Sequence, residues 1–166
     1  MVFVAEFRRR ASESAAGAQL HQDVARILFD EAQIIAGIDR VAAEITRAYT
    51  GRAFTVVSVL KGSCVFASDL IRRIPVPLQL AFVSAASYRD QTVAGELEVN
   101  FFPNDGEIEG QHLLLVDDIL DTGRTLSLLK AELSGRGAAS VSTCVFLDKP
   151  ARRAVEFAAD FRCFEV

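Results

Sequence analysis

The sequence predicts an α/β domain with a mainly parallel sheet flanked by helices. Its apolar residues gather into four short, nearly continuous runs, and segments with helical spacing lie between those runs. Continuous apolar runs are typical of strands buried on both faces, as in parallel sheets, and their alternation with helices indicates an α/β architecture. In such sheets ligands bind beyond the carboxyl ends of the strands. The four runs are 54–60, 78–83, 113–116 and 141–147.

Length and composition are those of one globular domain. The chain has 166 residues, of which 51% are hydrophobic and 24% charged, and its net charge is −4. The negative charge argues against a general nucleic-acid binder, because such proteins rely on a basic surface. No apolar run approaches the length of about 18 residues that spans a membrane. The three cysteines have apolar neighbours and are odd in number, which favours core residues in a reducing, cytoplasmic compartment.

The first element is expected only after an N-terminal extension. Residues 1–22 are predicted to be a flexible extension and residues 23–166 the domain, because the segment 8–18 is small, polar and without periodicity. A helical leader is the alternative. Asp30 and Gln33 form a capping-box pattern that predicts a helix start, and Gly51 stands beyond its expected end. Apolar residues at helical spacing lie between them, at Ile34, Ile38, Val41 and Ile45.

The remaining elements follow from periodicity and from turn residues. A strand at 54–60 precedes a helix at 64–73, which Pro75 and Pro77 close. The pattern then predicts, in order, a strand at 78–83, a polar loop at 84–95, a strand outside the main sheet at 96–102, a turn-rich connection at 103–110, a strand at 113–116, a helix at 124–133, a strand at 141–147 and a last strand at 161–166.

The segment 113–126, LLLVDDILDTGRTL, carries the candidate chemistry. A buried strand is followed by three acids and then by Thr-Gly-Arg-Thr at a helix start. Free amides and the helix dipole attract a phosphate there. Asp117 and Asp118 could accept hydrogen bonds from sugar hydroxyls or hold a metal ion through water. The plainer alternative is that Asp121 and Thr122 cap the helix while the other two acids are solvated.

This segment resembles a known signature. VDDILDTGRTL is similar to the phosphoribosyl-pyrophosphate-binding signature of the type I phosphoribosyltransferases. Three further segments narrow the resemblance to the hypoxanthine (guanine) phosphoribosyltransferases, and it extends from about residue 24 to residue 166. The three are Leu60-Lys61-Gly62-Ser63, Ser87-Tyr88, and Leu147-Asp148-Lys149-Pro150 with Arg152-Arg153.

The resemblance implies an enzyme of purine salvage with a small hood beside the sheet. It would transfer 5-phosphoribosyl from phosphoribosyl pyrophosphate to hypoxanthine or guanine, giving IMP or GMP and pyrophosphate, with Mg²⁺ held by the donor. Asp117 and Asp118 would contact the ribose and the waters of the metal. Asp121 would also exchange a proton with the purine N7. The 5′-phosphate would bind to Asp121, Thr122, Gly123, Arg124 and Thr125.

Other roles also come from the resemblance. Lys61 and Gly62 would bind pyrophosphate in a loop where a cis peptide bond without proline can occur, and Arg153 would contact pyrophosphate as well. Lys149 would donate to the purine 6-oxo group and so select oxopurines over adenine. Ser87 and Tyr88 would begin a mobile lid that excludes water, and Arg152 would be a solvated neighbour. A homodimer or homotetramer is the expected assembly.

The sequence departs from the family pattern at its end. The family continues beyond the Phe-Glu-Val of residues 164–166 with a segment that stacks on the purine and an acid that binds a second Mg²⁺, and Cys163 replaces a usual glycine. A truncated sequence, a relative that completes the site otherwise, and a donor-binding protein with weak or lost transfer remain alternatives. A regulatory RNA-binding relative is a further one, although such proteins usually carry a tyrosine where Asp121 stands.

Overall fold

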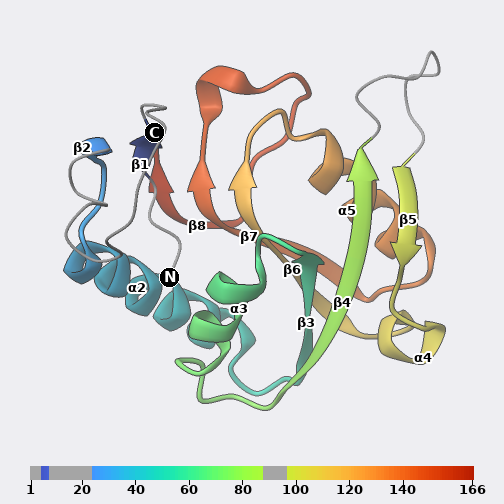
Figure 1. Cartoon of the computed structure of the whole chain (residues 1–166). Coiled ribbons are helices and arrows are strands. Elements are labelled where there is room, and N and C mark those ends of the chain that lie inside the picture. The colour runs from blue at the N-terminus through green and yellow to red at the C-terminus, as the bar shows by residue number, and fades with distance from the viewer. Residues whose placement is uncertain (1–4, 8–23, 88–96) are drawn as a thin grey trace, which may run out of the picture. The chain divides into compact units, whose positions relative to one another are not determined.

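A six-stranded sheet organises residues 37–166 (Figure 1). Its strand order is β5-β4-β3-β6-β7-β8. Five strands are parallel, and β5 pairs antiparallel with β4 at one edge, which confirms the predicted mainly parallel sheet. The strands are β3 (Phe54–Leu60), β4 (Leu78–Ser87), β5 (Leu97–Phe101), β6 (His112–Leu120), β7 (Ser140–Asp148) and β8 (Phe161–Glu165).

This computed structural model describes residues 5–7, 24–87 and 97–166. The chain divides into two units, residues 1–36 and residues 37–166. In the first unit β1 (Ala5–Phe7) pairs antiparallel with β2 (Val24–Ile27). The predicted extension at 8–18 and the lid residue Tyr88 lie outside the described residues.

Helix α2 (Glu31–Tyr49) begins where the capping box predicts. The Gln33 amide donates to Asp30 Oδ1 at 2.8 Å, and the Asp30 amide donates to Gln33 Oε1 at 2.9 Å. Each side chain thereby satisfies an amide that the helix itself leaves without a partner. The predicted apolar stripe is buried from Ile38 onward, at Ile38, Val41 and Ile45.

The other helices are α3 (Cys64–Ile71), α4 (Asp105–Ile108), α5 (Arg124–Gly135) and the 3-10 turn η1 (Pro150–Arg152). Of these, α3 and α5 pack on opposite faces of the sheet. Alternate residues of a strand point to opposite faces, and β7 shows the two layers. Val145 packs in the cluster that includes α5, whereas the ring of Phe146 lies 5.5 Å from that of Phe66 in α3.

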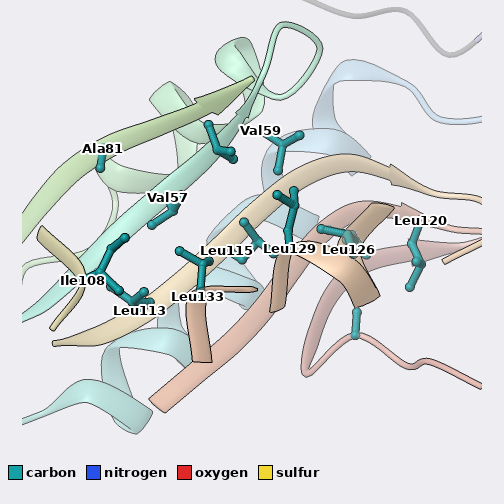
Figure 2. Close-up of a cluster of buried hydrophobic side chains, with 13 residues drawn as sticks. Val57, Val59, Ala81, Ile108, Leu113, Leu115, Leu120, Leu126, Leu129 and Leu133 are labelled. Carbon is teal, nitrogen blue, oxygen red and sulfur yellow. The ribbon is translucent and has the colours of Figure 1, made fainter. Parts of the chain in front are cut away.

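A hydrophobic core lies between the sheet and α5 (Figure 2). Leu126, Leu129 and Leu133 recur on one side of α5 and are at most 1% exposed. Burying each of them contributes about 2 kcal/mol. They pack against β3 and β6, and all four residues 113–116 are fully buried. Residues of β6 that point to either face are therefore covered, as in a parallel strand.

Four sequence predictions were wrong, three about the bounds of elements and one about a cysteine. Strand β4 continues to Ser87, and β5 joins the main sheet, because Ser84 to Ser87 pair with residues 97–101. Backbone pairing at a sheet edge does not require an apolar run, so the polar sequence concealed it. The 103–110 connection contains α4, whose Asn104 and Glu107 form a second capping box. Cys64 is exposed, unlike the buried Cys144 and Cys163.

Candidate active site

The segments singled out from the sequence meet at the carboxyl ends of neighbouring strands. Strands β3, β6 and β7 are adjacent and parallel. The 60–63 loop follows β3, the 121–125 loop follows β6, and the 149–154 segment follows β7. Ser87 is the last residue of β4, which pairs with β3 on its other side. The described candidate residues therefore gather at the carboxyl-terminal ends of the strands.

Asp117 and Asp118, the acid pair, lie inside β6 and not in a loop after it. The strand runs to Leu120 because its register with β7 continues as far as Leu120 and Asp148. The Asp118 amide donates to Asp117 Oδ1 at 2.9 Å. Burial, reinforced by the negative charge of Asp118, raises the pKa of Asp117 from 3.8 to about 8. Asp117 is therefore mostly protonated at pH 7 in the free protein.

The 60–63 loop is anchored by buried hydroxyls and touches the acid pair. Ser63 Oγ donates to the Val59 carbonyl at 2.6 Å and lies 2.7 Å from Ser58 Oγ. The Leu60–Lys61 peptide bond is cis, which agrees with what the resemblance implies for this loop. A Cβ added to Gly62 would lie 2.9 Å from Asp118 Cγ, and closer still to its Oδ2. Glycine is thus required for the loop backbone to lie against this carboxylate.

The 121–125 loop turns into α5 through a left-handed residue. Gly123 has φ of +84°, and Arg124 begins the helix. The Arg124 amide donates weakly to Thr122 Oγ1 at 3.5 Å. A Cβ on Gly123 would lie 3.0 Å from Arg153 Cδ. The loop therefore presents the amino end of a 12-residue helix while its underside packs on the 149–154 segment.

Arg153 connects these two segments. Its guanidinium donates to the carbonyls of Leu120 and Asp121 and pairs with the carboxylate of Asp148. The side chain of Arg153 is 15% exposed and that of Asp148 only 6%. Asp148 was not singled out for a role from the sequence, although a charged residue ending an apolar run must be paired or solvated. That signal was available to find it.

Arg152 is more than a solvated neighbour. Its Nε lies 2.8 Å from Asp121 Oδ1, although the Arg152 side chain is 67% exposed. Among the described residues no hydrogen bond of good geometry reaches that buried oxygen, so the interaction is an ion pair. It places a cation beside the carboxylate that the resemblance makes the proton acceptor or donor.

Lys149 and Ile119 also lie at the carboxyl-terminal ends of the strands. The Lys149 amide donates to the Leu120 carbonyl at 3.0 Å, which fixes the start of the 149–154 segment beside β6. Ile119 is 40% exposed within β6, between the acid pair and Asp121. An exposed isoleucine among acids offers the apolar surface that an aromatic ligand needs. Sequence reasoning missed Ile119 because its neighbours are acids that drew the attention, and nothing in the local pattern shows that this side chain stays exposed within the strand.

The acid pair suits a metal ion that a substrate brings with it. Among the described residues no group of three or more His, Cys, Asp or Glu side chains is arranged to hold a metal. Mg²⁺ commonly uses one or two carboxylates together with water and substrate phosphates. Asp117 and Asp118 supply such a partial set, so the residues fit Mg²⁺ as a partner of a phosphorylated ligand.

Comparison with known proteins places this chain among phosphoribosyltransferases. The family model for the phosphoribosyl transferase domain matches residues 25–166. The chain is 34% identical over 148 residues to the hypoxanthine-guanine phosphoribosyltransferase of Streptococcus pneumoniae, covering 89% of this chain and 82% of that enzyme. The crystal structure of a hypoxanthine phosphoribosyltransferase from Staphylococcus aureus is similar with a TM-score of 0.84 and 31% identity, covering 92% of this chain and 83% of that one.

A longer relative matches as well. The chain is 38% identical over 148 residues to the bifunctional protein TilS/HprT of Listeria monocytogenes, covering 89% of this chain. It spans only about a quarter of the length of that relative, 23%. Within the described parts of the chain, no helix combines the length and apolar character needed to cross a membrane.

Proposed function

The chain belongs to the hypoxanthine-guanine phosphoribosyltransferase family, and we propose that it is an enzyme of purine salvage. It transfers 5-phosphoribosyl from phosphoribosyl pyrophosphate to hypoxanthine or guanine and releases pyrophosphate. The observation that carries this proposal is the contact between Gly62 and Asp118. It joins a loop suited to pyrophosphate to an acid pair suited to ribose, beside a helix terminus suited to phosphate.

The donor's 5′-phosphate binds at the 121–125 loop. Amides in the first turn of α5 have no partner within the helix, and the helix dipole adds a favourable field for an anion. The left-handed Gly123 lets the backbone turn without a side chain. The hydroxyls of Thr122 and Thr125 add donors, and the exposed Arg124 adds positive charge.

The acid pair binds the ribose hydroxyls and the waters of Mg²⁺. Bound Mg²⁺ supplies positive charge that stabilises the departing pyrophosphate. A cation near Asp117 would favour the ionised form of this residue, which is protonated in the free protein because burial raises its pKa to about 8. The two carboxylates then face the ribose as the bond from C1′ to the pyrophosphate oxygen breaks. Their negative charge stabilises the cationic sugar of the transition state.

The acceptor half of the site rests on three side chains. The Lys149 ammonium donates to the purine 6-oxo group, which adenine lacks. Ile119 supplies apolar surface for the ring. As a purine nitrogen forms its bond to C1′, the ring loses a proton, and Asp121 accepts it at N7. The electron pair of the broken C1′–O bond leaves with pyrophosphate, so the transfer is balanced.

Pyrophosphate leaves along the 60–63 loop, where Lys61 and Gly62 contact it. The exposed ammonium of Lys61 and the loop amides are suitable donors. Ser87 and Tyr88 begin the lid that excludes water from the reacting sugar. The contact of Arg153 with pyrophosphate, implied by the resemblance, competes with the protein contacts that its guanidinium already makes.

A homodimer or homotetramer in the cytoplasm is the proposed setting. Val65, three residues beyond Gly62, is apolar and 41% exposed, which suits burial against a second copy of the chain. The three free cysteines of the chain suit a reducing compartment. Size-exclusion chromatography with light scattering tests the assembly, and a monomer at micromolar concentration contradicts it.

One assay tests the reaction. The protein is incubated with phosphoribosyl pyrophosphate, Mg²⁺ and, separately, hypoxanthine, guanine, xanthine, adenine or uracil. We expect IMP from hypoxanthine or GMP from guanine and no product from adenine or uracil. Measurable donor binding without product from any oxopurine overturns the enzyme proposal and favours a donor-binding protein. Tight binding of RNA, measured in parallel, favours a regulatory role.

A further inference from the structure

Asp148 and Arg153 form a buried ion pair across the η1 turn. Asp148 ends β7, and Arg153 lies five residues later, after the η1 turn. A buried carboxylate without a partner is strongly destabilising, so Asp148 holds the guanidinium in place. Nη1 of Arg153 donates outside its own segment, to the carbonyls of Leu120 and Asp121.

We propose that Arg153 is a positioning residue that fixes Asp121 relative to Lys149, and that Asp148 orients Arg153. The inference rests on the proposed function, because Asp121 and Lys149 act there on the same purine. N7 and the 6-oxo group are neighbouring positions of one rigid ring. A proton acceptor for one and a hydrogen-bond donor for the other must therefore keep a fixed separation.

Backbone contacts on both sides of Arg153 support this role. The Lys149 amide donates to the Leu120 carbonyl at 3.0 Å, and the Ala154 amide donates to the Thr122 carbonyl at 2.9 Å. These two bonds flank Asp121 but do not reach it, so a third contact is needed to fix Asp121 to the 149–154 segment. Arg153 supplies that connection, and its guanidinium can bind several acceptors in a fixed plane.

Direct contact with pyrophosphate fits these observations less well. The Arg153 side chain is 15% exposed, and its Cδ lies beneath Gly123, 3.0 Å from where a Cβ would be. To reach an anion in the site, the guanidinium would leave the 6%-exposed carboxylate of Asp148 unpaired. Breaking a buried pair in this way is costly. The neighbouring Arg152 and the exposed Lys61 are better placed for a mobile anion.

Arg153→Lys and Asp148→Asn test the proposal, with Arg73→Lys as the matched control. Lysine keeps the charge but cannot span three acceptors in one plane. Arg73 is also half-buried and also binds a carboxylate and a carbonyl, those of Asp39 and Asp69, but it lies beyond α3, away from the site. Folding is checked by circular dichroism and thermal melting. Kinetics are measured in both directions, and hydrogen exchange is followed in peptides covering residues 120–125.

We expect kcat with hypoxanthine to fall about 100-fold in Arg153→Lys, as for a misplaced reacting group. The KM for pyrophosphate in the reverse reaction stays within about threefold, since the loss of a charged hydrogen bond to the anion would raise it by about tenfold or more. Amides of 120–125 exchange faster in Arg153→Lys and in Asp148→Asn, and Arg73→Lys behaves as wild type. A raised KM for pyrophosphate with unchanged kcat overturns the proposal.

Hydrogen exchange separates this inference from the proposed function. If the wild-type protein forms no nucleotide, the proposed function fails, yet the exchange rates still decide whether Arg153 holds the loop. Faster exchange at 120–125 in both variants supports the positioning role, and unchanged exchange in either well-folded variant overturns it.

Discussion

Replacing Asp117 with asparagine is expected to make the donor-free protein more stable at alkaline pH. Burial and the charge of Asp118 raise the pKa of Asp117 from 3.8 to about 8. The folded protein therefore retains a proton that the unfolded chain has already lost. The sign follows: Asp117 lowers the stability of the fold progressively as pH rises from about 4, and the loss levels off above about 8. Asparagine has no proton to lose and escapes this effect.

The size of the effect follows from the slope of stability with pH. Each pH unit between the unfolded and folded pKa values removes about 1.4 kcal/mol. Between pH 6 and pH 9, the free energy of unfolding of wild type falls by about 3 kcal/mol through Asp117. Most of this fall comes before the pH exceeds the folded pKa of about 8. This is a large part of the 5–15 kcal/mol typical of a domain. The raised pKa values of Cys144 and Cys163 act equally on both proteins and cancel.

Urea unfolding at pH 6, 7, 8 and 9, without donor or Mg²⁺, provides the measurement. The difference in unfolding free energy between Asp117→Asn and wild type should grow in favour of the variant up to about pH 8, the pKa of Asp117. Asp105→Asn is the control, because the Asp105 side chain is 83% exposed, and its difference from wild type should not depend on pH in this range. Parallel pH curves for wild type and Asp117→Asn refute the reasoning.

Three further predictions concern the loops and the reacting groups. Gly62→Ala should keep the fold but weaken donor binding about 10-fold or more, because the new Cβ displaces the carboxylate of Asp118. Calorimetric titration with the donor measures this affinity. Gly135→Ala is the control and should bind the donor as wild type, because Gly135 has open space around it. Gly123→Ala should lose about 1–3 kcal/mol of stability in urea unfolding, since its φ is +84°. Asp121→Asn should lower kcat with little change in donor affinity, whereas Lys149→Ala should reduce the preference for hypoxanthine over adenine; equal small effects from both contradict their assigned roles.

The parallel sheet could be predicted because buried parallel strands leave an unambiguous signal. The run 54–60 is apolar almost throughout, and β3 covers the same residues. β5 gave a weaker signal. It is an edge strand that pairs through its backbone with Ser84 to Ser87, and edge pairing places few demands on side chains. Its membership of the sheet depends on pairing with residues ten or more positions away, which no local pattern contains.

The candidate site shows the same division between local and distant information. Three acids and a Thr-Gly-Arg-Thr loop are adjacent in sequence, so the sequence indicated their chemistry. The contacts of Arg153 with the carbonyls of Leu120 and Asp121, and the ion pair between Arg152 and Asp121, arise because the segment after β7 packs against the end of β6. Likewise, the approach of Gly62 to Asp118 depends on β3 and β6 being neighbours. Tertiary pairing of charges, rather than residue type, decides which arginine faces which acid.

The charged residues of the site differ in what compensates their charge, and this distinguishes the three acids from Arg153. Asp117, Asp118 and Asp121 lie within five residues, and such a cluster is unfavourable unless the charges are offset. Asp117 is offset by a proton, Asp121 by the exposed Arg152, and Asp118 by backbone amide contact. In the proposed function, a divalent cation, a purine proton or a sugar hydroxyl replaces each of these partners. Arg153 instead has buried partners within the protein, so under the same proposal it belongs to the frame that holds the three acids.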